Sequence, residues 1–241
     1  MELRRFFVAP TDVADDGKIT VRGGEAEHIA RVLRMKKGFK AIVCTGDGSE
    51  ITAEITDISR DSVTMRRLAE RKADRRDAHL TLYCGILKNK NLDFVVRHAV
   101  ELGVDRIIPF CSSRTDETSF NAERGNKIAL EAAKQCGSVF LSEVCEPLTF
   151  AQMTEQFGEY DAVYFCYENE RRRPLAALRP EGKRFALVVG SEGGFTEEEV
   201  REAQDKGAVT VTLGRRILRA ETADIVACAF ALGAMGELDY D

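Results

Sequence analysis

The sequence predicts an α/β protein in which a small antiparallel β domain, residues 1–73, precedes a larger domain with a parallel sheet, residues 74–241. Two observations support this division. Short alternating apolar runs follow one another at hairpin spacing up to residue 68, whereas from residue 80 apolar strands alternate with helical patterns, which is typical of a parallel sheet. The stretch between them, 66–76, is charged and lacks apolar periodicity, so it is predicted to be a linker.

The N-terminal part predicts a small antiparallel barrel. Charge gives way to an apolar run at its first strand, and its one helix carries Ile29, Val32 and Leu33 on one face before Gly38 ends it. Turn residues separate the remaining runs. The predicted elements are a strand at 4–8, a helix at 25–35, and strands at 39–44, 51–58 and 62–68.

The C-terminal part predicts alternating strands and helices. A helix with one apolar face begins at Leu92 and stops at Gly103, a second covers 122–135, and the last begins near Glu221. Thr196 and Glu199 have the spacing of a capping box and predict the start of another helix. The predicted strands are 80–87, 106–110, 162–167, 185–189 and 209–213.

Two glycine-bearing loops follow the last two strands, at 190–194 (GSEGG) and around Gly214. The carboxyl ends of strands in open α/β sheets are where ligands usually bind. The first loop has the spacing of neither a dinucleotide fingerprint nor a P-loop, and Glu192 would repel a phosphate. A neutral or cationic ligand held by backbone groups fits the loop, with an ordinary strand-to-helix turn as the alternative.

Composition restricts the setting and the partners. We expect a cytosolic protein without a membrane segment, because no stretch is long and apolar enough to span a bilayer. Seven scattered cysteines and three histidines have no metal-ligand spacing, so no metal site is expected. The net charge is −5, yet residues 1–76 carry +3 and the remainder −8, which indicates that the N-terminal part faces a polyanion.

The two loop motifs also carry a family resemblance. Gly-Ser-Glu-Gly-Gly-Phe-Thr-x-x-Glu, from Gly190, and Leu-Gly-x-Arg-Ile-Leu-Arg-x-Glu-Thr-Ala, from Leu213, resemble the ribosomal RNA small subunit methyltransferase E family. Residues 101–104 and 131–135 match it as well. The family belongs to the SPOUT superfamily, so the resemblance implies a C-terminal trefoil knot, which is rare among folds, and a PUA-like RNA-binding domain at the N-terminus. It also implies a homodimer with its site at the subunit interface.

The same resemblance implies methylation of N3 of a uridine in 16S rRNA, as free RNA or within the small subunit, with S-adenosylmethionine as cofactor. Two positions depart from the family: Ser191 stands where proline is usual, and Gly137-Ser138 stand where an arginine and a proline usually follow Gln135. The residues expected to bind the cofactor are Tyr167, Gly190, Ser191, Glu192, Gly193, Gly194, Leu213, Gly214, Ile217, Leu218, Arg219 and Thr222.

Methyl transfer from a sulfonium is an in-line displacement and demands positioning more than a reactive side chain. The uracil N3 proton must leave, so a carboxylate base or a stabilising cation is expected nearby. The candidates are Glu192, Glu221 and Arg219, although Glu221 could simply favour a helix N-terminus.

The expected RNA contacts are basic. The candidates are Arg4, Arg5, Arg31, Arg34, Lys36, Lys37 and Lys88, with Lys40 beside them in the N-terminal cluster. A solvated helix end is the alternative reading of that cluster. The alternatives for the whole protein are an RNA-binding protein that has kept the fold without activity, and a methyltransferase with another RNA acceptor.

Overall fold

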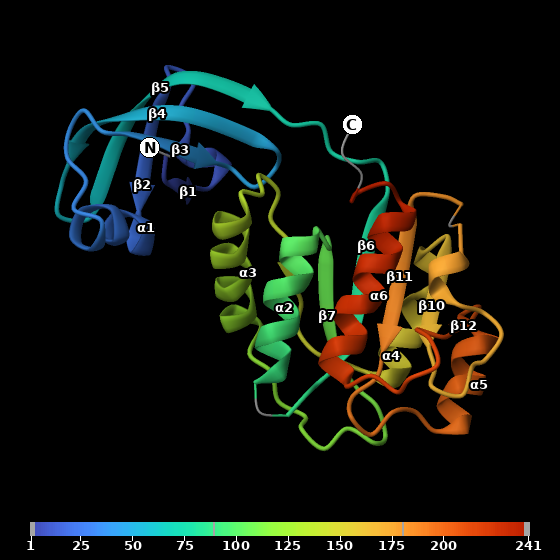
Figure 1. The fold of residues 1–241 in the computed structure, drawn as a ribbon. Helices are drawn as coiled ribbons and strands as arrows, with labels where there is room; N and C mark the ends of the chain where they lie inside the picture. The colour runs from blue at the N-terminus through green and yellow to red at the C-terminus, as the bar shows by residue number, and fades with distance from the viewer. Residues whose placement is uncertain (1–2, 89, 180, 239–241) are drawn as a thin grey trace. The chain divides into compact units, whose positions relative to one another are not determined.

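The computed structural model describes residues 3–88, 90–179 and 181–238, and the chain divides into two compact units. The first comprises the chain up to Arg75 together with Ala133–Leu141, and the second comprises Arg76–Ala132 and the chain from Ser142 onward. Each unit has its own sheet (Figure 1). The boundary near residue 75 lies close to the expected one, and residues 133–141, which belong by sequence to the expected C-terminal domain, are grouped with the first unit.

The first unit contains a five-stranded sheet in the order β1-β3-β4-β5-β2. β1 pairs in parallel with β3, and the other pairings are antiparallel. One face of the sheet encloses an apolar core that includes Ile19, Val43 and Met65, and the turn His28–Val32 (η2) adds Ile29 to it. The elements are β1 Arg5–Phe7, η1 Pro10–Asp12, β2 Lys18–Arg22, α1 Gly23–Glu27, η2, β3 Lys40–Cys44, β4 Ser49–Ile58 and β5 Ser62–Lys72.

The prediction of a linker from residue 66 is wrong, because β5 continues to Lys72. Its second half pairs with β4, from Ser49↔Lys72 to Ala53↔Arg67, past a register shift. Most side chains of this half are exposed and charged. A strand whose outer half faces water lacks the apolar alternation by which strands are recognised.

Residues 133–141 join the first unit through backbone contacts with the turn before β4. The Gly48 amide donates to the Val139 carbonyl at 3.2 Å, and the Leu141 amide donates to the Gly46 carbonyl at 3.1 Å. The Arg75 guanidinium lies over the Phe140 ring, 5.4 Å from its centroid. These long-range contacts have no local pattern in the sequence.

The second unit is built on a seven-stranded sheet whose pairings are all parallel. Its order is β12-β10-β11-β6-β7-β8, and β9 also pairs with β7. The predicted α/β fold with a parallel sheet is therefore confirmed. The strands are β6 His79–Gly85, β7 Arg106–Cys111, β8 Glu143–Val144, β9 Leu148–Thr149, β10 Ala162–Cys166, β11 Arg184–Val189 and β12 Val209–Val211.

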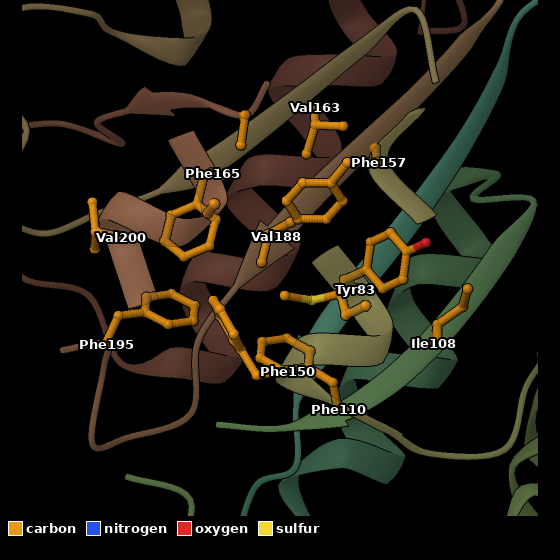
Figure 2. Packing of buried hydrophobic residues seen from close by; sticks show 14 residues of the cluster. Tyr83, Ile108, Phe110, Phe150, Phe157, Val163, Phe165, Val188, Phe195 and Val200 are labelled. Carbon is orange, nitrogen blue, oxygen red and sulfur yellow. The ribbon is translucent and has the colours of Figure 1, made fainter. Parts of the chain in front are cut away.

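Helices cover both faces of this sheet. Ala186 and Val188 of β11 face an aromatic cluster contributed partly by α4 and α5, and Figure 2 shows Phe150, Phe165 and Phe195 packed there. The alternate residues of β11 face α6, which packs beside α2 (Figure 1). The helices are α2 Asn91–Leu102, α3 Ala122–Cys136, α4 Phe150–Glu155, α5 Glu197–Asp205 and α6 Ala220–Ala234, with short 3-10 turns η3 Gln156–Glu159 and η4 Leu175–Ala177.

Two predicted helix boundaries are confirmed in detail. Thr196 and Glu199 form the capping box of α5, since the Glu199 amide donates to Thr196 Oγ1 and the Thr196 amide to Glu199 Oε2. Gly103 ends α2 with φ of 101°. Within the described ranges, the structure contains no helix with the length and apolar character to cross a membrane.

Candidate functional site

The carboxyl ends of β10, β11 and β12 lie at one edge of the sheet, because these strands are parallel and adjacent. The segments that follow them, together with the start of α6, surround a cavity of about 620 Å³. Its lining residues are Asn91, Cys166, Tyr167, Glu168, Arg171, Val189, Gly190, Ser191, Glu192, Gly193, Gly194, Phe195, Thr212, Leu213, Gly214, Arg216, Ile217, Leu218, Arg219, Ala220, Glu221 and Ala223.

The first loop is fixed by backbone packing against the end of β6. A Cβ atom on Gly85 would lie 2.2 Å from the Ser191 backbone nitrogen, so a side chain at this position is incompatible with the observed loop. Gly194 has φ of 63°, and its amide donates to the Ser191 carbonyl at 2.9 Å to close the turn. The glycine content of the loop therefore serves close approach and one left-handed residue.

Polar contacts hold the other side of this loop. Ser191 is buried, with its hydroxyl 3.4 Å from Thr115 Oγ1. The Ser113 amide donates to Glu199 Oε1 at 2.7 Å, which ties the start of α5 to the segment after β7. Ser191 is thus held by its burial and its contact with Thr115. The turn from Ser191 to Gly194 forms with serine at the position where the family resemblance leads one to expect proline.

The second loop leads into α6. Gly214 donates its amide to Thr212 Oγ1 at 3.2 Å, and Arg219 is the N-cap residue of the helix, with its carbonyl accepting from the Ala223 amide at 2.8 Å. Arg219 therefore stands at the helix start and is one of the residues that line the cavity.

Six charged side chains line the cavity: the carboxylates of Glu168, Glu192 and Glu221 and the guanidiniums of Arg171, Arg216 and Arg219. Glu192 accepts a hydrogen bond from the Lys88 backbone amide at 3.1 Å. Across the described part of the chain, none of the six forms an ion pair within the protein. A cavity wall with unpaired charges of both signs can bind a ligand that carries charges of both signs.

Eleven of the twelve residues expected to bind the cofactor line this one cavity. The exception is Thr222, which is exposed in the first turn of α6 and does not line it. All three expected catalytic residues, Glu192, Arg219 and Glu221, are on the cavity wall. Their roles remain predictions.

Several lining residues were not expected from the sequence. Glu168 and Arg171 follow β10, and the sequence signals them only by their place after a strand end, since Arg171 lies in a charged turn that is typical of solvent-exposed surface. Asn91 at the start of α2 lies about a hundred residues before the two loops, and only the tertiary structure brings it to the cavity.

Asp224 of α6, next to the lining residue Ala223, is fully buried, and neither carboxylate oxygen has a hydrogen-bond partner among the described residues. Burial, with a smaller effect of the Glu221 charge, raises the pKa of Asp224 well above its usual range. Burial likewise raises the pKa of the Cys166 thiol, which lines the cavity and stays protonated at neutral pH. A thiolate nucleophile at this site is therefore not supported.

The residues expected to bind RNA fall into different settings. Arg5 is mostly buried and pairs with Glu50 at 2.6 Å, and Arg71 and Arg5 together lower the pKa of the Glu50 carboxyl. This pairing engages the Arg5 guanidinium within the first unit, so we leave Arg5 out of the RNA surface. Lys88 belongs to the second unit, where its Nζ lies 2.5 Å from Asp116.

The other five are exposed on the first unit: Arg4, Arg31, Arg34, Lys36 and Lys37. Only Arg31 among them forms an ion pair within the described residues, with Glu27 at 2.7 Å. In the described part of the chain, no group of three or more histidine, cysteine or acidic residues is arranged to hold a metal ion.

Two family models match the chain. One, for an RNA methyltransferase domain, covers residues 74–232, and the other, for an RNA methyltransferase PUA domain, covers residues 21–66. The fold and the loop cavity thus define an RNA methyltransferase with a PUA domain, and the predicted PUA-like domain is confirmed.

Individual relatives identify the family within the RNA methyltransferases to which the chain belongs. The chain is 29% identical to ribosomal RNA small subunit methyltransferase E of Bacillus subtilis (strain 168), over 93% of this chain and 94% of the relative. It is 30% identical to the protein of the same name from Synechocystis sp., over 93% and 76%. The chain belongs to the ribosomal RNA small subunit methyltransferase E family.

A solved structure shares the whole fold. The Neisseria gonorrhoeae ribosomal RNA small subunit methyltransferase E bound to S-adenosyl methionine superposes with a TM-score of 0.84 and 26% identity, over 96% of this chain and 98% of that one.

Proposed function

We propose that this protein uses S-adenosylmethionine to methylate N3 of a uridine in 16S rRNA, and that it acts as a homodimer. The observation that carries the proposal is the cavity between the two glycine loops, with unpaired charges of both signs on its wall. Family membership and the cofactor-bound Neisseria relative support the choice of ligand.

The residues fit this cofactor. The cavity volume of about 620 Å³ is within the range of roughly 300–1,000 Å³ that is typical of small-molecule sites. The cofactor carries a sulfonium, an ammonium and a carboxylate, and the wall offers three carboxylates and three guanidiniums. The fixed backbone of 190–194 and of 213–219 would hold the uncharged parts. When bound, the cofactor supplies an electrophilic methyl group.

The chain's own residues would prepare the acceptor. Glu192 is oriented by the Lys88 amide and Glu221 by the first turn of α6, so either carboxylate can accept the N3 proton of a uracil placed against the cavity. Arg219 lies on the same wall with no ion pair in the described chain, and it would stabilise negative charge on the uracil as the proton leaves.

A second subunit would complete the site. Ile217, 84% exposed, lies on the loop that lines the cavity, and Phe230, 38% exposed, lies on α6, the helix that follows this loop. Water-exposed apolar groups of this size next to a site indicate an interaction surface. We also propose the C-terminal knot that the family resemblance implies.

The decisive experiment is nucleoside mass spectrometry of 16S rRNA. Small subunits from cells lacking the protein are incubated with the purified protein and S-adenosylmethionine. We expect N3-methyluridine to appear, and to form far more slowly when Arg219→Ala replaces the wild type. A methylated ribose in its place would assign another acceptor, and tight cofactor binding without any new nucleoside would support an inactive RNA-binding protein.

A further inference from the structure

The first unit exposes an aromatic ring within its most basic segment. Residues 31–40, here called the basic segment, contain five basic residues and no acidic one. Phe39 lies in this segment with 51% of its surface exposed, and Val32 at its start is 67% exposed. Covering a large apolar side chain that faces water with a flat partner lowers the free energy of the system.

The backbone beneath Phe39 is fixed. Its amide donates to the Lys36 carbonyl at 3.0 Å, and its carbonyl accepts from the Ile55 amide of β4 at 2.8 Å. The preceding Gly38 amide donates to the Ile55 carbonyl at 2.8 Å. The ring is therefore presented by an ordered turn that is joined to the sheet, and little chain entropy would be lost when a ligand covers it.

The cations that neighbour Phe39 in the sequence are available to a ligand. Arg34, Lys36, Lys37 and Lys40, here called the free cations, are exposed, and their side chains form no ion pair or hydrogen bond with any described residue. Lys40 lies opposite Glu54 in the β3–β4 register, but that carboxylate bonds Arg66 at 2.8 Å. No carboxylate of the described residues pairs with the free cations, so an external anion can pair with them.

Leu68, another exposed apolar residue of the unit, lacks this setting. Leu68 on β5 is 40% exposed, and it too lies among arginines. Those arginines are neutralised, because Arg66 pairs with Glu54 and Arg67 with Glu70 at 2.7 Å. Free charge and an exposed ring occur together at the basic segment.

We propose that the basic segment binds single-stranded RNA, with one unpaired base stacked on the Phe39 ring and the flanking phosphates contacted by the free cations. Proteins that bind unpaired nucleotides combine an aromatic stacking surface with positive charge along the backbone. Bases inside a duplex already stack on their neighbours and cannot cover the ring, so the site selects unpaired RNA. This inference rests on RNA being the substrate of the proposed function.

The absence of tryptophan from the chain permits a direct test. Phe39→Trp introduces the chain's single tryptophan at the site, and Leu68→Trp introduces it at the matched control position. We expect a short single-stranded oligouridine to quench the fluorescence of Phe39→Trp, a duplex RNA of equal length to quench it far less, and neither to affect Leu68→Trp.

Affinity measurements separate stacking from general apolar contact. Stacking is commonly worth about 1–3 kcal/mol per base, so Phe39→Ala should weaken oligouridine binding roughly 5- to 150-fold. Phe39→Leu should lose most of the same affinity, whereas Phe39→Trp should keep it. A preserved circular dichroism spectrum and unchanged S-adenosylmethionine affinity show that the variants are folded.

Three results would overturn the proposed stacking on Phe39: no quenching of Phe39→Trp by oligouridine, wild-type affinity of Phe39→Leu for oligouridine, or equal quenching by duplex RNA. Wild-type affinity of Phe39→Leu for oligouridine would indicate a general apolar contact in place of stacking. These results leave the proposed function standing if the wild-type protein still methylates rRNA. Failure of the wild-type protein to methylate rRNA would overturn the proposed function by itself.

Discussion

Gly85 at the end of β6 packs directly against the backbone of the first glycine loop, 190–194, which we propose binds the cofactor. In Gly85→Ala the added Cβ would lie 2.2 Å from the Ser191 nitrogen and 2.8 Å from the Gly190 carbonyl carbon. Ordinary contact begins near 3.4 Å, so the loop or the strand end must move by more than about 1 Å. Both partners are backbone, and no flexible side chain can absorb the shift.

Two effects of Gly85→Ala can be measured. Overpacking of this kind costs about 1–3 kcal/mol of folding free energy, observable as a lower midpoint in thermal or chemical unfolding. A displacement of about 1 Å in a binding loop can reduce its function on the order of a hundredfold, so calorimetry should show a much weaker S-adenosylmethionine affinity.

Gly158→Ala is the matched control for this substitution. Gly158 lies in the same unit, at η3, and a Cβ there would meet no atom within 4 Å. It should leave both stability and cofactor affinity close to those of the wild type. Wild-type affinity in Gly85→Ala would refute the reasoning that close backbone packing shapes the cavity.

Further expectations concern catalysis, stability, RNA and assembly. Arg219→Ala should lower the methylation rate about a hundredfold to a thousandfold while changing cofactor affinity only a few-fold, as measured by single-turnover kinetics and calorimetry. Asp224 has a raised pKa in the folded protein, so its contribution to stability is fully present below about pH 4 and is lost as pH rises through the folded pKa; Asp224→Asn should therefore gain stability over the wild type at neutral pH in urea unfolding, and this gain should vanish toward about pH 4. Charge reversal of Lys36 and Lys37 together should flatten the salt dependence of RNA binding by roughly two phosphate contacts, and an unchanged slope would place the RNA elsewhere. Phe230→Glu should shift the protein to monomers in sedimentation and reduce its methylation rate, whereas a fully active monomer would contradict a shared site.

The local sequence sufficed for features that depend on neighbouring residues. The capping box at Thr196 and Glu199 and the glycine end of α2 follow from contacts within four residues, and the structure has both. Short apolar runs located most strands of the parallel sheet, because a strand buried on both faces is apolar along its length. The two loop motifs supplied ten of the eleven expected cofactor residues that line the cavity, since parallel adjacent strands deliver their following loops to the same edge.

The tertiary structure alone decided how those loops are supported. The Lys88 amide meets Glu192 across 104 residues, and Gly85 meets Ser191 over a similar separation. No periodicity records such pairs, because each member of a pair satisfies its own local pattern. The contacts of residues 133–141 with the turn before β4 have no local signal for the same reason.

The sequence also did not determine which basic side chains are paired with carboxylates within the protein. Arg5 and Lys36 are both basic residues near apolar runs, yet Arg5 is paired with Glu50 in a mostly buried position and Lys36 is exposed without a partner in the described chain. Residue identity determines that a side chain is cationic. Whether that charge is neutralised within the protein or remains for RNA depends on which carboxylates folding brings within reach, because the attraction between charges falls with distance and is screened by water.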